Sequence, residues 1–438
     1  MTIKFGTDGI RGPVESEITP EVCLRIGHAA GVVLKEMGWE TVLIGKDTRV
    51  SGYMLESALQ AGFIASGVNV RLLGPLPTPG VAYLTRSLRN QFGLVISASH
   101  NDYLDNGIKL FAGTGEKISK DAEKKIEKLL EGKLKPVPTA ELGKARRFDE
   151  SGDRYIEFCK STVPADVSFD SLRIVLDCAN GACYKVSPSV LRELGAEVIC
   201  IGTDPDGYNI NHECGSTYPE RAQDEVIKQR ADFGIALDGD GDRVVLIDRD
   251  GNILDGDDIM YILAYANPNR TGAWSGIVGT AMTNLGFEEG VKKLGYKFKR
   301  ADVGDKYVSQ MLQKEGWMLG GEPSGHIICR DLVSTGDGTI AALKVISSLL
   351  ILEKDPAEIL RNYSKMPQIN ISVNVKNKDI LSDSKIQQKI KEIESDLTVG
   401  RVLVRASGTE SKIRVMVESD DATTASKYAK DIAEMFAR

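Results

Sequence analysis

Short apolar runs alternate with stretches of helical periodicity along most of this chain. The run Thr41–Thr48 is predicted to be a buried strand, Met54–Ser66 a helix and Val68–Gly74 a second strand. A strand, a helix and a strand in this succession form a βαβ unit, whose two strands are parallel. The same succession returns over Arg173–Gly202 and again over Gly276–Gly304, so the sequence contains one structural unit three times.

One further strand follows each copy, and each of these strands ends in a polar loop. The three strands start alike, at Gln91, Asp232 and Gly316. In open α/β sheets, ligands bind beyond the carboxyl ends of the strands, so the three loops are predicted to face one cleft. The loops read Ser97-Ala-Ser-His-Asn-Asp102, Asp238-Gly-Asp-Gly-Asp-Arg243 and Gly321-Glu-Pro-Ser-Gly-His326.

The periodicity lapses at a charged stretch, Lys144–Asp153, and at a turn-rich stretch, Asp250–Asp258, and it changes character near Pro367. We therefore expect three similar mixed α/β domains with layered sheets and a smaller C-terminal α+β domain, arranged around a central cleft. Their expected bounds are 1–153, 154–254, 255–365 and 366–438. The last domain is predicted to contain the strand Ile369–Val375, the helix Lys385–Leu397, the hairpin Arg401–Glu418 and the helix Ala422–Phe436.

The composition is that of an ordinary globular enzyme. The net charge of −7 argues against a nucleic-acid partner, because binding to the phosphate backbone needs a basic face. No run approaches the roughly 20 apolar residues of a membrane span, and the first residues contain no apolar signal segment, so we expect a cytoplasmic protein without a membrane partner. The seven cysteines form no Cys-x-x-Cys pair and are interpreted as reduced.

The first polar loop carries the candidate nucleophile, Ser99, with His100 and Lys109 as nearby proton-transfer groups. An ordinary loop serine is the alternative. Near the N-terminus, the glycine-dense segment Phe5–Gly12 contains Arg11, which either belongs to a turn or reaches towards a phosphate on Ser99.

The second loop places Asp238, Asp240 and Asp242 at alternate positions, which in an extended loop point the same way. Three converging carboxylates repel one another unless a cation holds them, and ligation by oxygen alone favours Mg²⁺ or Mn²⁺. A calcium loop of the EF-hand type is excluded, because the positions that need Gly and Glu are Arg243 and Arg249. A solvated acidic turn is the alternative.

The remaining loops offer groups for a phosphorylated sugar. Glu322 and Ser324 suit vicinal hydroxyls, and His326 suits a proton carrier or a phosphate donor, although a plain turn explains the Gly and Pro equally well. The tip of the C-terminal hairpin is rich in hydrogen-bond donors and suits a phosphate. No phosphate-binding Gly-rich loop of the ATPase type and no dinucleotide fingerprint is present, which disfavours ATP and nicotinamide chemistry. The phosphate-binding candidates are Arg405, Ser407, Gly408, Thr409 and Arg414.

Taken together, these motifs resemble the α-D-phosphohexomutase family over essentially the whole chain. The family combines an Ala-Ser-His-Asn loop, an Asp-Gly-Asp-Gly-Asp-Arg loop, a Gly-Glu-x-Ser-Gly-His loop and an Arg-x-Ser-Gly-Thr-Glu loop. All four occur here in order, and they end at His100, Arg243, His326 and Glu410. The chain departs from the usual pattern at Asp102 and Ser411, where the family has Pro. It also departs at Pro323 in the third loop, Gly321–His326.

The resemblance implies a phosphoserine at Ser99 and one Mg²⁺ per subunit, held by the three aspartates and an oxygen of that phosphate. It implies catalytic roles for Ser99, His100, Lys109, Arg11 and His326, and substrate binding by Arg243, Glu322, Ser324 and His326. Within the family, four segments resemble the branch that interconverts glucosamine-6-phosphate and glucosamine-1-phosphate for UDP-N-acetylglucosamine and cell-wall precursors. These segments are Phe5–Gly12, Gly74–Arg86, Asp105–Lys109 and Ser334–Gly338.

The resemblance further implies activation by glucose- or glucosamine-1,6-bisphosphate and a homodimer. Three alternatives stay open at this point. In the first, the chain is a phosphomannomutase/phosphoglucomutase with the same mechanism. In the second it is a phosphatase that hydrolyses its own phosphoserine, and in the third a non-catalytic protein that binds sugar phosphates. The choice between Lys109 and His326 as the proton carrier is also open.

Overall fold

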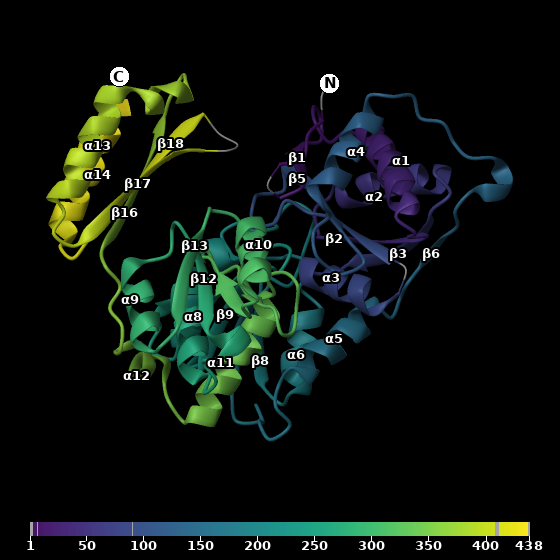
Figure 1. Ribbon diagram of the computed structural model, residues 1–438. Coiled ribbons are helices and arrows are strands. Elements are labelled where there is room, and N and C mark those ends of the chain that lie inside the picture. Colours follow the sequence, from purple (N-terminus) through teal and green to yellow (C-terminus); the bar gives the residue numbers. More distant parts are fainter. Residues whose placement is uncertain (1–2, 7, 90, 408–410, 437–438) are drawn as a thin grey trace.

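The computed structural model describes residues 3–6, 8–89, 91–407 and 411–436. In it the chain forms four β-sheets flanked by helices, with the C-terminal sheet set apart from the other three (Figure 1). The central strands of the larger sheets are buried on both faces, as the continuous apolar runs predict. In β2, for example, Val42, Leu43 and Ile44 are fully buried.

The first three sheets repeat one arrangement, which confirms the predicted threefold repeat. A central strand pairs in parallel with the next strand on one side and with the following strand on the other. The last of these then turns back into an antiparallel strand. The four strands of the first copy are β2 Thr41–Lys46, β3 Asn69–Pro75, β4 Gln91–Ile96 and β5 Asp105–Phe111; of the second, β7 Arg173–Asp177, β8 Glu197–Ile201, β9 Phe233–Leu237 and β10 Val244–Asp248; and of the third, β12 Gly276–Thr280, β13 Lys297–Ala301, β14 Leu319–Gly321 and β15 Ile327–Cys329.

The antiparallel return strands β5, β10 and β15 were not among the predicted elements. They place each polar loop between the end of a parallel strand and the start of its antiparallel neighbour, at the same position in all three sheets. Short strands extend the sheets at their edges: β1 Ile10–Pro13, β6 Ala145–Arg147 and β11 Ile253–Leu254.

Helices connect and cover the strands of these three sheets. None of the helices in the described part of the chain has both the length and the apolar character needed to cross a membrane. The helices are α1 Pro20–Glu36, α2 Gly52–Ala65, α3 Thr78–Ser87, α4 Lys120–Leu130, α5 Ser151–Ser161, α6 Val186–Glu193, α7 Glu220–Gln229, α8 Gly256–Ala266, α9 Leu285–Lys293, α10 Asp305–Glu315, α11 Gly338–Leu352 and α12 Pro356–Leu360, with the 3-10 turns η1 Thr139–Glu141, η2 Gly215–Thr217 and η3 Gly272–Trp274.

The hydrophobic core shows which parts of the molecule form one body. A single buried cluster extends through all three larger sheets and includes Leu43, Leu176 and Ile277. The first sheet has a second cluster of its own beneath α1 and α2. The C-terminal sheet shares neither, because its apolar side chains form a separate cluster. The fourth domain is therefore joined to the rest by its connecting segment and by polar contacts.

The fourth domain has the predicted α+β fold. Its sheet is antiparallel, with β18 between β16 and β17, and two helices cover the face that is turned away from the rest of the molecule (Figure 1). The fold class expected from the sequence is thus confirmed, and we retain the four domain boundaries as a proposal. The elements are β16 Gln368–Asn374, η4 Lys378–Ser382, α13 Ser384–Asp396, β17 Gly400–Ala406, β18 Lys412–Ser419 and α14 Ala422–Phe436.

Candidate active site

Ser99 lies in the loop between β4 and β5, where its side chain meets the loop of the second domain. Its Oγ donates a 2.7 Å hydrogen bond to Oδ2 of Asp238 and lies 3.4 Å from Nδ1 of His100. Ser99 has a φ of +53°, a left-handed conformation that is uncommon for a residue with a Cβ atom. Such conformations occur where the surrounding structure enforces them, often at functional sites.

The chain reverses after Ser99 even though Asp102 stands where the family usually has Pro. The Asp102 carboxylate accepts a 2.9 Å hydrogen bond from the amide of Leu104, two residues further on. This is an Asx turn, which constrains the backbone by a hydrogen bond instead of a proline ring. The departure from the family pattern therefore retains a turn at this point of the loop.

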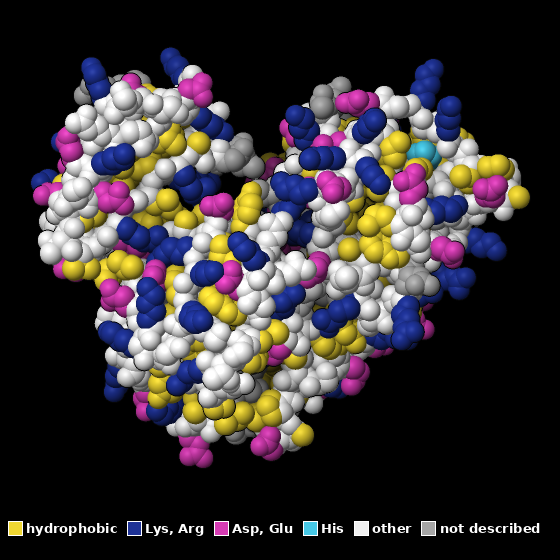
Figure 2. Space-filling model, viewed as in Figure 1, with side chains coloured by type: hydrophobic (Ala, Val, Ile, Leu, Met, Phe, Trp, Pro, Cys, Tyr) yellow, Lys and Arg dark blue, Asp and Glu magenta, His cyan; other side chains and the backbone are white. Residues whose placement is uncertain are grey.

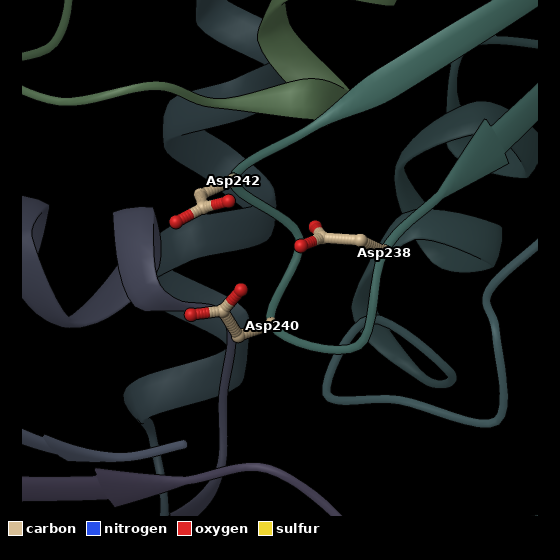
Figure 3. Close-up of side chains that lie close together, drawn as sticks. All are labelled: Asp238, Asp240 and Asp242. Atoms are coloured by element: carbon tan, nitrogen blue, oxygen red, sulfur yellow. The ribbon is translucent and has the colours of Figure 1, made fainter. Parts of the chain in front are cut away.

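The carboxylates of Asp238, Asp240 and Asp242 point towards a common centre in the loop between β9 and β10 (Figure 3). One oxygen from each lies within 4.8 Å of the others, and all three residues are buried. The loop is a tight turn, because the amide of Gly241, at a φ of +72°, donates to the carbonyl of Asp238 at 3.0 Å. The prediction that this loop is extended is therefore wrong. The prediction that its three carboxylates converge is confirmed.

The donor set of this triad fits a small divalent cation. Oδ1 of Asp240 and Oδ1 of Asp242 are buried without a hydrogen-bond partner. Burial, together with the neighbouring charges of Asp242 and Asp240, raises the pKa of Asp238 well above its ordinary value. A bound cation would relieve both the repulsion and the unsatisfied oxygens, and oxygen-only ligands suit Mg²⁺.

Lys109, on β5, lies against the same carboxylates. Its Nζ is 2.9 Å from Asp240, 3.2 Å from Asp242 and 3.2 Å from Asp8, and the side chain is buried. Burial alone would lower the pKa of Lys109, but the charges of Asp240, Asp8 and Asp242 outweigh it and raise the pKa well above the ordinary value. Lys109 is therefore an ammonium ion that neutralises part of the acidic cluster.

Arg11 belongs to β1, which pairs with β5, so the segment forms a strand at this point rather than a free turn. Its guanidinium is paired with Asp8, which also contacts Lys117 at 2.6 Å. Burial opposes the charged form of Arg11, but Asp8 raises its pKa, with further support from Asp240 and Asp242. Arg11 is thus on the Ser99 side of the cleft and within electrostatic range of the second loop, Asp238–Arg243, called the metal loop below.

His100 follows the candidate nucleophile directly but is held in its neutral form. Burial, followed by the nearby positive charges of Arg243 and Arg11, lowers its pKa to about 3. The neutral imidazole is able to accept or donate one hydrogen bond near Ser99 Oγ.

The third loop brings His326 and Glu322 to the same cleft. His326 Nε2 accepts a 3.1 Å hydrogen bond from the Gly336 amide, and its Nδ1 lies 3.6 Å from Asp242. Burial lowers the pKa of His326, but the Asp242, Asp305 and Glu322 carboxylates together outweigh burial and raise it. Glu322 accepts a 3.0 Å bond from the Gly304 amide, and Ser324 is exposed. One nitrogen of the His326 ring is thus held by a backbone hydrogen bond, and the other faces the Asp242 carboxylate.

Arg243 closes the second loop and links it to the third. Its amide donates to Asp238 at 3.0 Å, and its guanidinium lies 4.0 Å from Asp242. Burial opposes the charged form, whereas Asp242, Asp238 and Glu322 raise the pKa of Arg243. The guanidinium therefore lies between the second loop and the third.

The C-terminal hairpin presents Arg405 directly opposite Arg414, in register on β17 and β18. Nε of Arg405 is buried without a hydrogen-bond partner. Burial and the charge of Arg414 lower the pKa of Arg405, while Glu322 of the third domain opposes this shift. An anion at this point would satisfy Nε of Arg405. Ser407 is buried beside them, whereas Gly408 and Thr409 lie outside the described residues.

The hairpin faces the other three loops across an open space. Figure 2 shows the molecule hollowed between the C-terminal domain and the first domain, with Lys and Arg side chains along the hollow. The structure thus brings the first three loops together, because Ser99 and His326 both contact carboxylates of the second loop. It places Arg405 and Arg414 on a separate domain, with Arg405 within electrostatic range of Glu322.

Comparison with known proteins agrees with this arrangement. The chain matches domains I, II, III and IV of phosphoglucomutase/phosphomannomutase over residues 2–136, 153–251, 255–366 and 369–435. The chain belongs to this family. The resemblance to the α-D-phosphohexomutases is therefore confirmed, and the members of this family are mutases, a class of isomerase.

Several relatives match the chain over nearly its whole length. Phosphoglucosamine mutase of Cellvibrio japonicus is 52% identical over 99% of both chains. Phosphoglucosamine mutase of Polynucleobacter asymbioticus is 51% identical over 98% of both, and that of Chromobacterium violaceum is 52% identical over 98% of this chain and 97% of the relative.

Solved structures share the fold at lower identity. A phosphoglucomutase/phosphomannomutase family protein from Burkholderia thailandensis is 24% identical, with a TM-score of 0.81 over 99% of this chain and 96% of that one. N-acetylphosphoglucosamine mutase from Aspergillus fumigatus, in complex with GlcNAc-6P and magnesium, is 19% identical, with a TM-score of 0.72 over 99% and 95%.

Some residues of the site were not found from the sequence. Thr78, at the start of α3, donates a 2.5 Å hydrogen bond to Asp240, and Asp8 joins Arg11 and Lys109. Arg49, just beyond β2, binds carbonyl groups of the Ser99 loop. The position of Arg49 beyond the carboxyl end of a parallel strand is the signal that would have found it.

Proposed function

We propose that this protein is a phosphoglucosamine mutase, which interconverts glucosamine-6-phosphate and glucosamine-1-phosphate through a phosphoserine enzyme. The observation that carries the proposal is the 2.7 Å hydrogen bond between Ser99 Oγ and Asp238 of the buried carboxylate triad. This bond supports Ser99 as the nucleophile, because its hydroxyl lies beside carboxylates that suit a divalent cation. Relatives about half identical over nearly the full chain support the amino-sugar substrate.

Ser99 Oγ carries the phosphoryl group in the resting enzyme. In the first step the bond between phosphorus and Oγ breaks and a bond to the free sugar hydroxyl oxygen forms. That hydroxyl loses its proton, and the released Ser99 Oγ gains one. The product is the 1,6-bisphosphate. After the bisphosphate turns around, its other phosphoryl group passes to Ser99 Oγ. The Ser99 hydroxyl loses its proton in this step, and the sugar oxygen that the phosphoryl group leaves gains one. The two steps balance, so no external phosphate is consumed.

The residues that would hold Mg²⁺ are Asp238, Asp240 and Asp242, together with an oxygen of the Ser99 phosphate. When bound, the ion withdraws charge from the transferring phosphoryl group. Lys109 supplies a fixed positive charge to the same carboxylates, and Arg11 adds a second at the Ser99 side of the cleft. Lys109 is buried and Arg11 is half-buried, and electrostatic stabilisation of the transferring group is largest where water is excluded.

The substrate would be held at two places. Glu322, Ser324 and Arg243 bind hydroxyl groups near the metal loop, with His326 fixing that side of the cleft. The second phosphate binds at the hairpin, to Arg405, Ser407 and Arg414 with Gly408 and Thr409. Because either end of the bisphosphate must reach Ser99 in turn, a distal phosphate site on a separate domain suits both orientations.

The proposal also covers the setting in which the enzyme acts. We propose that a trace of glucose- or glucosamine-1,6-bisphosphate primes Ser99, that the enzyme is a cytoplasmic homodimer, and that it binds neither nucleic acid nor membrane. Glucosamine-1-phosphate would then supply UDP-N-acetylglucosamine synthesis.

Phosphorus-31 NMR tests the substrate directly. The Mg²⁺-loaded protein, with a trace of glucose-1,6-bisphosphate, is offered glucosamine-6-phosphate and, separately, mannose-6-phosphate and glucose-6-phosphate. We expect the anomeric phosphate signal to grow fastest from the amino sugar. Faster turnover of the neutral hexoses would make the chain a phosphomannomutase/phosphoglucomutase, and release of inorganic phosphate in step with substrate loss would make it a phosphatase.

A further inference from the structure

Two side chains, Arg49 and Asn211, donate hydrogen bonds to backbone carbonyls of the Ser99 loop. None of the proposed steps uses either side chain. Arg49 Nη2 donates to the carbonyl of Asn101 at 2.6 Å and reaches the carbonyl of Ser99 at 3.5 Å. Asn211 Nδ2, from a loop of the second domain, donates to the same two carbonyls at 2.8 Å each. Donors from two domains therefore converge on the same two oxygens.

These bonds act on a backbone that needs support. Ser99 has a φ of +53°, where a Cβ atom is sterically disfavoured. The carbonyl of Ser99 is bound by Arg49 and Asn211 while its hydroxyl is bound by Asp238. Holding the carbonyl therefore fixes the direction in which the hydroxyl leaves the backbone.

Arg49 is itself held rigidly. Its guanidinium pairs with the Asp47 carboxylate, which also accepts a 3.0 Å hydrogen bond from the Arg49 amide, and both side chains are 1% exposed. The Asp47 amide in turn donates to the carbonyl of Ile96 at the end of β4, 3.0 Å away. The planar guanidinium further bonds the Asp102 carbonyl through Nε at 3.3 Å and Nη2 at 3.1 Å, a fork that lysine lacks.

Asn211 is suited to its position by its own backbone. Its φ is +58°, a conformation that Asn tolerates better than most residues, and its amide donates to the carbonyl of Ala179 at 2.9 Å. The metal loop packs against the same point, because a Cβ atom added at Gly239 would lie 2.7 Å from both Asn211 Nδ2 and the Ser99 carbonyl oxygen. Asn211 thus contacts both catalytic loops.

We propose that Arg49 and Asn211 are positioning residues for phosphoryl transfer, which together hold the Ser99 backbone in the conformation that directs Oγ to Asp238. The inference rests on the proposed function for its kinetic consequence but not for its structural one. Neither side chain is among the groups that would bind sugar or phosphate. Their loss should therefore lower kcat and leave KM largely unchanged.

Asn211→Gly is the decisive variant, because glycine adopts the positive φ while removing the donor. Glu213→Gly is its matched control, since Glu213 lies two residues further on, is exposed and has a φ of +49°. Arg49→Lys keeps the charge beside Asp47 and removes the fork. Each full-length variant is compared with the wild-type protein by hydrogen–deuterium exchange of residues 97–103 and by kcat and KM for glucosamine-6-phosphate.

We expect faster exchange of residues 97–103 in Asn211→Gly and Arg49→Lys, with Glu213→Gly unchanged. We expect kcat to fall by about tenfold or more and KM to change by less than about twofold. Because both side chains act on one backbone segment, the double variant should lose less than the product of the two single losses.

Unchanged exchange in both single variants would overturn the inference. A rise in KM with constant kcat would likewise assign Asn211 to substrate binding. A wild-type protein that does not turn over glucosamine-6-phosphate would overturn the proposed function alone, since the exchange measurement still decides whether Arg49 and Asn211 hold the loop.

Discussion

The hydroxyl of Ser99 and the carboxylate of Asp238 are 2.7 Å apart, although 139 residues of sequence separate them. Asp238 is one of three buried carboxylates, and Lys109 is the buried ammonium ion in contact with the other two, Asp240 and Asp242. A phosphoryl group on Ser99 would add negative charge to a cluster that is already acidic. Phosphorylation of Ser99 and cation binding by the triad should therefore stabilise each other.

Replacing Ser99 with Ala should abolish mutase turnover. The variant has no oxygen to carry the phosphoryl group. It loses only the hydrogen bonds of the Ser99 hydroxyl with Asp238 and His100, each worth about 1 kcal/mol, so it should fold normally. Intact-protein mass spectrometry after incubation with glucose-1,6-bisphosphate should show one added phosphate on the wild type and none on the variant. Ser161→Ala, in an exposed position on α5, serves as the control. Normal turnover by Ser99→Ala would refute the phosphoserine mechanism.

Replacing Asp240 with Asn should remove the stabilisation that Mg²⁺ gives. Asn retains an oxygen that can accept from Lys109 and Thr78, but it removes one anionic ligand. A ligand at 100 times its Kd stabilises a folded protein by about 2.7 kcal/mol, so Mg²⁺ should raise the Tm of the wild type, and EDTA should reverse the rise. The variant should show little rise and little activity. Asp250→Asn, at an exposed residue beyond β10, should behave as the wild type. An undiminished rise in Asp240→Asn would place the cation elsewhere.

The repeat and the four loops could be predicted because they depend on local pattern. The period of apolar positions marks each βαβ unit, and the loops are rich in Gly, Asp and Ser, which have few structural reasons to gather. The return strands were missed because strand direction is set by pairing in the folded sheet. Val244–Asp248, for instance, is an apolar run whose antiparallel partner, β9, cannot be read from its own residues.

The charge state of the site could not be predicted for a similar reason. Lys109 was a candidate proton carrier because of its place in the sequence, but its protonation depends on Asp8 and Asp240, which lie far from it along the chain. The same holds for His100, whose pKa is lowered by burial and by Arg243 and Arg11. Contacts between distant segments decide these properties, and a residue pattern does not contain them.

Replacing Arg405 with Ala should weaken substrate binding more than catalysis. Arg405 and Arg414 face each other on the hairpin, where burial and mutual repulsion favour a bound anion. Loss of a bidentate phosphate contact should raise the KM for glucosamine-6-phosphate by about tenfold to a hundredfold, with a smaller fall in kcat. Steady-state kinetics at saturating Mg²⁺ measure both, with Lys430→Ala, at an exposed position on α14, as the control. A fall in kcat at constant KM would instead place Arg405 near the transferring phosphoryl group.

The fourth domain should close on the cleft by a hinge near Pro367. Asn284 of the third domain bonds both the amide and the carbonyl of Met366, each at 2.9 Å, and Arg401 donates to the carbonyls of Ala281 and Thr283 at 2.7 Å each. These contacts fix the base of the domain while its hydrophobic core stays separate. Small-angle X-ray scattering should show a smaller radius of gyration when glucose-1,6-bisphosphate is added. The Arg405→Ala variant should need more ligand for the same change. Identical profiles with and without ligand would contradict closure.

Asp337 should make the stability of the protein depend on pH. It caps α11 by accepting from the Ile340 amide at 2.9 Å, accepts from the Tyr155 hydroxyl at 2.9 Å, and is fully buried. Burial raises its pKa from 3.8 to about 7, although both hydrogen bonds oppose the shift. At pH values between these two pKa values, Asp337 keeps its proton in the folded state but has lost it in the unfolded state. The free energy of unfolding therefore falls as the pH rises from about 4 to about 7.

Asp337→Asn removes this titration while keeping a helix-capping side chain. Relative to the wild type, the variant should gain about 2–3 kcal/mol between pH 5 and pH 8, so the difference in Tm between variant and wild type should rise with pH. Thermal unfolding at a series of pH values measures this difference. For the control variant Asp250→Asn, the difference in Tm from the wild type should not change with pH. A constant difference for Asp337→Asn would mean that Asp337 stays ionised in the folded protein, with Tyr155 and the start of α11 stabilising the carboxylate against burial.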